Sequence, residues 1–259
     1  MEQLLWIALG AFAVMTLGWA WQLRTRNATF IDVLWTGGLA GAAVFAAVAG
    51  SGDGTRRFVL ALLVVAWGGR LIAHLIGRGA LRDPEDPRYT RLREMFPKQQ
   101  GPIFLIVFWI QALLVAILAL PFVFAASDAG AFPRITDVLA VLVWVVAIAG
   151  ESVADAQLER FRRKPENKGK VCDTGLWRFS RHPNYFFEWL NWCAYALLAL
   201  GAAGGWIALI APVLMLLLVT KVSGVPPTER RMLATRGEAF RAYQRRTSAF
   251  FPWFPKGAK

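Results

Sequence analysis

The chain has 259 residues, of which 56% are hydrophobic, and a formal net charge of +12. Its mean hydropathy of +0.44 lies far above that of soluble globular domains, so the composition excludes a soluble fold. The positive charge does not indicate nucleic-acid binding, because the basic residues lie between apolar segments and not on an exposed domain. We expect no nucleic-acid partner, and no obligate protein partner is evident. Membrane topology, anionic lipid and an anionic cofactor explain the charge better.

Apolar runs of about twenty residues recur along the chain, which is the length that a helix needs to cross the bilayer hydrocarbon. Each run is predicted to be a helix, because a helix satisfies its own backbone hydrogen bonds in lipid. The expected fold class is all-α: a single integral membrane domain (1–259), polytopic, with seven transmembrane helices. The predicted spans are 3–22, 30–50, 58–77, 102–126, 135–153, 186–205 and 206–222. The last two should form a tight hairpin.

Lys and Arg are distributed unevenly between these spans. Alternate segments and the tail together hold 25 of them, whereas the segments on the other side hold 3. By the positive-inside rule, the N-terminus is predicted to lie outside, and the basic loops and the C-terminal helix or tail are predicted to lie in the cytosol. The expected location is therefore multi-pass in a membrane.

The sixth span carries a stripe of polar side chains. Asn184, Glu188, Asn191 and Tyr195 recur at helical spacing, so they are predicted to lie on one helix face. Just upstream, Arg178-Phe-Ser-Arg-His-Pro-Asn-Tyr185 places cations at a helix N-terminus, which is a favourable position for anions. The alternative is a hydrogen-bond ladder that only joins helices.

The end of the fifth span combines acids with cations. Glu151 and Asp155 lie one helical turn apart, and Arg162, Arg163 and Lys164 follow them. Cations bind phosphates, whereas carboxylates accept hydrogen bonds from ribose hydroxyls and amides, so this pattern indicates a dinucleotide site. A solvated amphipathic helix end is the alternative. The sequence has no GxGxxG or Walker-type loop, so a nucleotide would be held without a Rossmann or P-loop unit.

Polar residues in the second and third spans are candidates for a substrate site. Asp32 and Trp35 share a helix face, and Arg70 and His74 are i, i+4 neighbours. One interpretation is that they line a substrate cavity and supply hydrogen bonds or a proton. The other is that Asp32 and Arg70 form a buried ion pair that orders two helices.

Two charged segments lie outside the spans. The loop 82–91 is dense in charge and turn residues and is expected to cap the bundle on the cytosolic side, with Tyr89 as a candidate proton donor. The tail that begins at Lys221 is also basic. Its alternative interpretation is an amphipathic helix lying on anionic lipid, so membrane lipids are expected partners.

A sequence signature occupies the C-terminal half. It runs as Thr174-Gly-Leu-Trp-Arg-Phe-Ser-Arg-His-Pro-Asn-Tyr-Phe-Phe-Glu188 and continues in the tail with Ser223-Gly-Val-Pro, Glu229 and Tyr243. This signature resembles that of the bacterial branch of the steroid 5α-reductase superfamily, whereas the N-terminal half matches only in its helix pattern. The resemblance implies a seven-helix oxidoreductase of steroid and lipid metabolism in the inner membrane of a bacterium. Such an enzyme uses NADPH to saturate the Δ4 double bond of a 3-oxosteroid or related lipophilic enone that enters from the bilayer.

The resemblance also implies a cofactor-binding half, 135–259, and substrate-side helices in 1–101. Asn184 and Glu188 match the Asn and acid that hold the cofactor, and Asp155 matches an acid at the end of the fifth helix. The full set of predicted cofactor-binding residues is Asp155, Arg162, Arg163, Lys164, Leu176, Trp177, Arg181, His182, Asn184, Tyr185, Glu188, Lys221, Glu229, Arg230 and Tyr243. No metal site is predicted.

For the substrate side, the resemblance implies that Asp32 stands in place of an acid that holds the substrate ketone in animal members. Arg70 or His74 then occupies the region of their substrate-holding Tyr. Together with Tyr89, these three are the predicted catalytic residues, while Trp35 and Asp32 are the predicted substrate-binding residues.

A membrane methyltransferase that uses S-adenosylmethionine is the main alternative. Isoprenylcysteine and phospholipid methyltransferases share an Arg-His-Pro-x-Tyr motif and acids in the tail, and here the motif is Arg181-His182-Pro183-Asn184-Tyr185. Asn184 followed by Glu188 favours the reductase, as does the basic loop, because S-adenosylmethionine is itself cationic. A non-enzymatic lipid-binding or scaffold protein would explain the basic tail but not the polar stripe.

Overall fold

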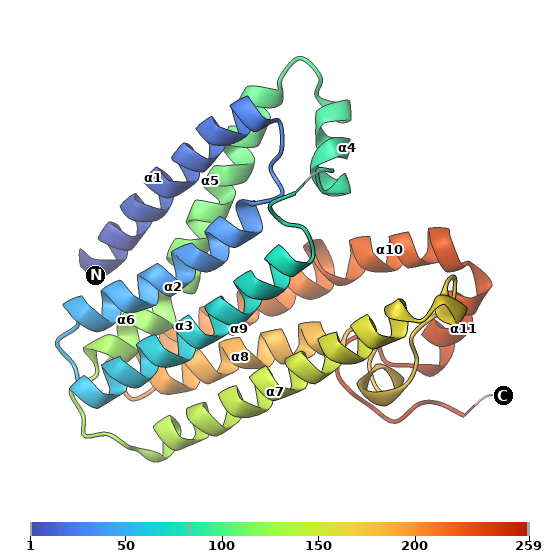
Figure 1. Ribbon diagram of the computed structural model, residues 1–259. Coiled ribbons are helices and arrows are strands. Elements are labelled where there is room, and N and C mark those ends of the chain that lie inside the picture. The colour runs from blue at the N-terminus through green and yellow to red at the C-terminus, as the bar shows by residue number, and fades with distance from the viewer. Residues whose placement is uncertain (1, 83, 258–259) are drawn as a thin grey trace. The chain divides into compact units, whose positions relative to one another are not determined.

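The computed structural model describes residues 2–82 and 84–257, and every regular element in these ranges is helical (Figure 1). The predicted all-α class is therefore confirmed for the described residues. Asp83 of the predicted cap lies outside them. The α-helices are α1 (Glu2–Thr25), α2 (Ile31–Ala49), α3 (Gly54–Gly77), α4 (Pro87–Met95), α5 (Gln100–Leu118), α6 (Leu120–Ser127), α7 (Ile135–Arg163), α8 (Pro183–Ala199), α9 (Ile210–Leu217), α10 (Val225–Arg236) and α11 (Glu238–Arg246).

Four short helical elements complete the chain. Three are 3-10 helices, η1 (Pro165–Asn167), η2 (Gly175–Arg178) and η3 (Gly205–Leu209), and η4 (Leu218–Val222) is a π-helix.

Six helical segments among the described residues are long and apolar enough to cross a membrane. The chain is thus a multi-pass membrane protein by helix length and composition. The predicted sixth span corresponds to α8, which has 17 residues and is not one of the six. The six segments are Glu2–Thr25, Ile31–Ala49, Gly54–Gly77, Gln100–Ser127, Ile135–Arg163 and Gly205–Arg236.

The chain divides into two compact units. The first unit comprises residues 1–136 and 198–210, and the second comprises residues 137–197 and 211–259. In the first unit α1 packs along α5 and α2 packs along α3 (Figure 1). Large apolar side chains on α1 face outward, among them Leu17 with 72% of its surface exposed, as expected for a helix in contact with lipid.

A buried charge cluster ties the start of α3 to the segment that follows α6. Arg56 has no exposed surface, and its Nη1 donates to the carbonyl oxygens of Asp128 at 2.9 Å and Gly130 at 2.8 Å. The Asp128 carboxylate lies 3.6 Å from Arg56 Nη1 and pairs with Arg134 at 2.8 Å. The side chain of Asp53 caps the same helix by accepting from Arg56 N. These contacts hold the segment after α6 against the start of α3.

Two predicted spans are interrupted, in each case near a proline. The span 102–126 forms two helices, because Pro121 has no N–H to donate back into the preceding turn and the helix restarts at Leu120. The span 206–222 is α-helical only in α9, between the 3-10 turn η3 and the π turn η4, and it contains Pro212. In both places the predicted span lies within one helical segment, and only its α-helical hydrogen bonding is interrupted.

In the second unit, α7 and α8 lie side by side (Figure 1). Gly150 on α7 permits their close approach, because a β-carbon there would lie 2.4 Å from the Phe187 ring on α8. The predicted hairpin between the last two spans is confirmed, since Trp189 Nε1 on α8 donates to the carbonyl oxygen of Pro212 on α9 at 3.0 Å. The charged helices α10 and α11 follow the apolar segment.

Candidate functional site

The polar stripe of α8 contacts α7 through Asn184 and Tyr195. Near the start of α8, Asn184 Nδ2 donates to Asp155 Oδ1 at 3.2 Å. Three turns further on, the Tyr195 hydroxyl accepts from Asn191 Nδ2 at 3.1 Å and from Trp144 Nε1 at 3.4 Å. The deep part of the stripe is therefore the interhelical ladder that the sequence left as an alternative.

The shallow part of the stripe brings together acceptors that a ligand can use. Asp155, Asn184 and Glu188 are each only partly buried. Glu188 Oε1 accepts from Trp192 Nε1 at 3.0 Å, and Glu151, one turn before Asp155 on α7, is buried. Two carboxylates and an amide thus lie along the facing sides of two helix ends, where they can accept hydrogen bonds from hydroxyl and amide groups.

Exposed cations lie close in sequence to these helix ends. Arg163 pairs with Glu159 at 2.9 Å, but both side chains are more than half exposed, so this pair neutralises little. Lys221 is exposed in the π turn η4, a type of turn that is frequent at functional sites. Within the described residues, no ion pair involves Lys164, Arg178, Lys221 or Arg230. The exposed cations of this region include Arg162, Arg163, Lys164, Lys168, Lys170, Arg178, Lys221 and Arg230.

Glu229 on α10 joins the Arg-His-Pro motif to the C-terminal tail. Its Oε1 accepts from Arg181 Nε at 2.6 Å and lies 3.2 Å from His182 Nε2, while its Oε2 accepts from Gln244 Nε2 at 2.7 Å. The guanidinium of Arg181 also donates to the carbonyl oxygens of Gln244 and Thr247. We call Arg181, His182, Glu229 and Gln244 the tail clasp. It fixes α10 and α11 to the start of α8.

The charge balance of the tail clasp changes the acidity of its carboxylate. Burial by itself raises the pKa of Glu229, but hydrogen bonds from His182 and Arg181, with the Arg181 charge, outweigh it and lower that pKa from 4.5 to about 2. Glu229 has only 14% of its side chain exposed, and it lies on the charged helix α10, beyond the apolar segment. Glu229 is therefore an ionised centre of the clasp at neutral pH.

Tyr243 reinforces the tail clasp from α11. Its hydroxyl donates toward the carbonyl oxygens of Trp177 and Ser180, and burial raises the pKa of Tyr243 well above its ordinary value, so the hydroxyl keeps its hydrogen. Tyr185 stacks on His182 with ring centroids 5.4 Å apart, and its hydroxyl lies 3.3 Å from Thr228 Oγ1.

The 3-10 turn η2 is tied to α7. Leu176 N donates to Gln157 Oε1, and Trp177 Nε1 donates to the carbonyl oxygen of Ala154, both at 2.9 Å. Gly175 adopts φ of +60°, a left-handed conformation that permits this turn. The segment that carries Leu176 and Trp177 is thus held beside the Asp155 end of α7.

The structure separates the predicted cofactor-binding residues into two groups. Arg181, His182, Glu229, Tyr243 and Tyr185 contact one another or the tail through the hydrogen bonds and stacking above. The second group comprises Asp155, Asn184 and Glu188 on α7 and α8, with the exposed cations that follow α7 in the sequence. Sequence analysis missed Gln244 and Thr228, because neither has a charge or a spacing that distinguishes it from a surface residue.

The first unit brings together two of the four predicted catalytic residues. Asp32, in the first turn of α2, pairs with Arg88 on α4 at 2.8 Å, and the Arg88 guanidinium lies 5.3 Å from the centre of the Tyr89 ring. The sequence offered an ion pair between Asp32 and Arg70 as an alternative. That alternative was wrong, because the ion-pair partner of Asp32 is Arg88. The reason is that α4 begins at Pro87, capped by Asp86, and places Arg88 in its first turn.

Tyr89 is the most buried of the candidate proton donors. Its ring packs on Phe104 with centroids 6.2 Å apart, and its side chain is buried. Burial first, and then the negative charge of Asp32, raise the pKa of Tyr89 above its ordinary value. Its hydroxyl forms no hydrogen bond with any described residue. Tyr89 thus stays neutral, and its hydroxyl can donate a hydrogen bond to another group.

Arg70 and His74 lie one turn apart on α3, as predicted, and both are partly buried. Trp35 packs edge-on against Trp67 of α3, with ring centroids 6.4 Å apart. The described residues contain no group of three or more His, Cys, Asp or Glu side chains that could hold a metal ion.

Residues 18–247 match a family described as "Protein of unknown function (DUF1295)". The chain belongs to the DUF1295 family. This family lies within the steroid 5α-reductase-like superfamily, so the resemblance inferred from the Thr174 to Glu188 signature is confirmed at the level of the superfamily. The match names no specific steroid reductase.

The chain is also similar to an uncharacterized protein, C594.04c, of Schizosaccharomyces pombe. It is 26% identical over 269 residues, which cover 93% of this chain and 77% of the relative. No solved structure matches the chain.

Proposed function

We propose that this DUF1295 chain is an NADPH-dependent reductase that saturates the Δ4 double bond of a 3-oxosteroid or related lipophilic enone. One observation carries the proposal: the exposed side chains of Lys164, Arg178, Lys221 and Arg230 form no ion pair with any described residue, and Lys164 and Arg178 lie in the sequence between α7 and α8, which carry the carboxylate and amide acceptors. Membership in the steroid 5α-reductase-like superfamily supports it.

The chemistry of these side chains fits a phosphorylated dinucleotide. Asp155 and Glu188 can accept hydrogen bonds from ribose hydroxyls or a carboxamide, and Asn184 can both donate and accept. Arg162 lies seven residues after Asp155 on α7, which is about 10 Å along the helix, on nearly the same face. Phosphates would bind Arg162, Arg163, Lys164 or Lys221, because guanidinium and ammonium groups pair with phosphate oxygens.

Bound NADPH would supply a hydride to the β-carbon of the enone. The protein's own task is then to hold the ketone of the substrate and to stabilise the negative charge that develops on its oxygen. Tyr89 suits this role, because its side chain is buried as a whole and its hydroxyl is protonated and forms no hydrogen bond with the described residues. Arg88 beside it adds positive charge, while Asp32 fixes Arg88 in place. A proton delivered to the α-carbon completes the reduction.

The proposal includes seven spans with the basic loops and the tail in the cytosol of a bacterium. The seventh span is α8, which is 17 residues long. The opposite side holds few cations, as the positive-inside rule requires for this orientation. Arg56 and Arg134 bind Asp128 there, and Arg57 donates to the carbonyl oxygens of Ala47 and Gly50.

A methyltransferase that uses S-adenosylmethionine is the second candidate, because of the shared Arg-His-Pro-x-Tyr motif. In this structure Arg181 and His182 of that motif bind Glu229 of the chain's own tail. The motif therefore does not by itself favour either cofactor. The cations without ion pairs do favour NADPH, because S-adenosylmethionine is cationic and gains nothing from them.

The activity test uses the full chain, purified in detergent, with NADPH and a panel of 3-oxo-Δ4-steroids. We expect the steroids to accelerate NADPH oxidation, and Glu188→Ala and Asn184→Ala to lower kcat/KM about tenfold or more, as expected for loss of a charge-assisted or buried hydrogen bond.

The matched control is Glu166→Ala, which removes an exposed acid from η1 and should leave kcat/KM unchanged. Transfer of a labelled methyl group from S-adenosylmethionine to a lipid, with no NADPH oxidation, would instead support the methyltransferase.

A further inference from the structure

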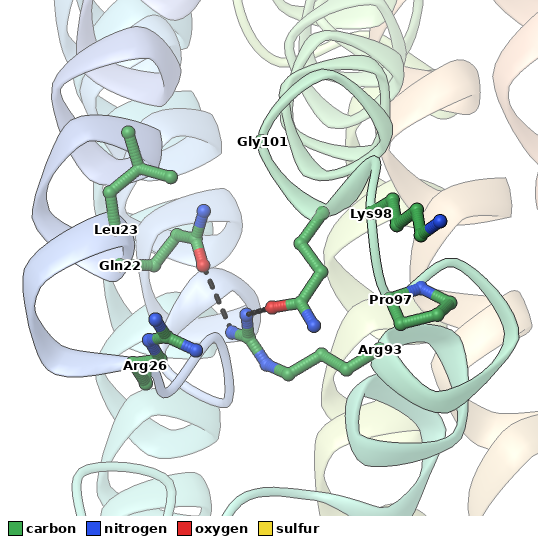
Figure 2. A pocket seen from close by; sticks show the side chains of 8 residues that line it. Gln22, Leu23, Arg26, Arg93, Pro97, Lys98 and Gly101 are labelled. Atoms are coloured by element: carbon green, nitrogen blue, oxygen red, sulfur yellow. Dashed lines mark hydrogen bonds between the residues drawn. The ribbon is translucent and has the colours of Figure 1, made fainter.

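A polar pocket lies in the first unit, where the end of α1 meets α4 and the first turn of α5 (Figure 2). Its volume is about 290 Å³. The lining includes three cations, Arg26, Arg93 and Lys98, and two amides, Gln22 and Gln100. None of these residues takes part in the proposed reduction.

Gln22 presents a buried donor in this pocket. The residue has no exposed surface, and its Oε1 accepts from Arg93 Nη2 at 2.9 Å. Because a guanidinium only donates, the amide oxygen must face Arg93, and Figure 2 shows the amide nitrogen turned away from it. Gln22 Nε2 has no hydrogen-bond partner within the described residues. A buried donor without an acceptor is destabilising, so an acceptor in the pocket would satisfy it.

Arg93 positions Gln22 but contributes little net charge. It pairs with Glu85 through hydrogen bonds of 2.8 and 2.9 Å and lies 4.1 Å from the centre of the Phe104 ring. Arg26 and Lys98 are both exposed, and neither forms an ion pair with any described residue. The uncompensated charge of the pocket therefore comes from these two side chains.

The backbone of Arg26 is unusual. Its φ is +53°, in the left-handed region where glycine normally ends a helix, and its N–H donates to the carbonyl oxygen of Gln22 at 2.9 Å. A non-glycine residue pays strain for this conformation, and such strain is concentrated at functional sites. Here the conformation ends α1 and places a cation at the rim of the pocket.

An apolar hollow lies over the preceding turns of α1. Its volume is about 450 Å³, and Leu17, Trp21 and Leu34 are among its lining residues. Trp21 is more than half exposed, as is typical of aromatic side chains at the membrane–water interface. An anionic group and an apolar chain could thus be held by one end of one helix.

We propose that this pocket binds the phosphate headgroup of an anionic phospholipid. Arg26 and Lys98 pair with the phosphate, Gln22 Nε2 donates to one of its oxygens, and an acyl chain lies against the apolar hollow. The inference uses only the first unit and does not depend on the proposed reductase activity.

The test measures the thermal midpoint of the full chain in neutral detergent during titration with phosphatidylglycerol, phosphatidylcholine or inorganic phosphate. We expect phosphatidylglycerol to raise the midpoint at concentrations where the other two do not. For Arg26→Gln combined with Lys98→Gln, the same rise should need on the order of tenfold or more phosphatidylglycerol, because each basic residue adds to binding at an anionic surface.

The matched control combines Arg24→Gln with Arg91→Gln. It removes the same charge from α1 and α4 at exposed positions outside the pocket, and it should respond like the wild type. An equal loss in both double variants would show unspecific attraction and would overturn the proposal. A rise with inorganic phosphate equal to that with phosphatidylglycerol would overturn the lipid as the ligand.

Discussion

Glu229→Ala is expected to lower the free energy of unfolding by about 3 kcal/mol or more. The substitution removes the carboxylate that Arg181, His182 and Gln244 share, and it leaves the mostly buried guanidinium of Arg181 without its counter-ion. Breaking a buried ion pair from one side costs more than the pair itself contributes, since the other charge stays desolvated. Denaturant unfolding in mild detergent, followed by tryptophan fluorescence, measures the change.

The control for this substitution is Glu238→Ala. Glu238 pairs with Arg245 and Arg241 on α11, but its side chain is 66% exposed, so its loss should leave the stability close to that of the wild type. If both variants unfolded at the same denaturant concentration, the tail clasp would not stabilise the protein.

The tail clasp also makes stability depend on pH in a defined window. The native pKa of Glu229 is lowered from 4.5 to about 2, so its ionised form stabilises the fold. This contribution is complete above about pH 5 and is lost as the pH falls toward 2. The stability difference between wild type and Glu229→Gln should therefore be constant near neutral pH and shrink on acidification. A constant difference down to pH 2 would contradict this account.

Arg56→Ala is expected to destabilise the first unit by about 3 to 5 kcal/mol. Arg56 has no exposed surface, and its guanidinium satisfies the carbonyl oxygens of Asp128 and Gly130 as well as the Asp128 carboxylate. Alanine would leave these acceptors buried with fewer donors, and the Asp128 carboxylate would keep Arg134 and the backbone N–H of Gly130 but lose Arg56. The thermal midpoint in detergent reports the loss.

Arg78→Ala is the matched control, because it removes the same charge from the other end of α3 at an exposed position. Its midpoint should stay close to that of the wild type. Equal midpoints for Arg56→Ala and Arg78→Ala would mean that the buried cluster carries no net stability.

The sequence predicts the helices of this fold well, because apolar length and backbone hydrogen bonding leave few other choices in lipid. It fails where a proline interrupts a long apolar run, as at Pro121, since apolar periodicity continues across the break. The composition of residues 82–91 also does not predict the helix α4. The loop 82–91 has the composition of a turn, yet Asp86 and Pro87 provide a helix start.

The candidate site is predictable only in part, and the reason is physical. The stripe on α8 follows from helical spacing, and its contact with α7 follows from the need of buried polar groups for partners. The partner of Asp32 does not follow, because Arg88 and Arg70 carry the same charge and sequence gives no distance to either. For the same reason, spacing alone could not show that Arg181 and His182 contact Glu229 and the tail.

The most direct test of the proposed function is a cofactor titration. The full chain in detergent would be titrated separately with NADPH and S-adenosylmethionine while its thermal midpoint is followed, because a ligand that binds only the folded state raises the midpoint. The proposal predicts that NADPH raises the midpoint of the wild type and does not raise that of Glu188→Ala. A rise with S-adenosylmethionine alone would contradict the reductase and assign α7 and α8 to a methyltransferase site.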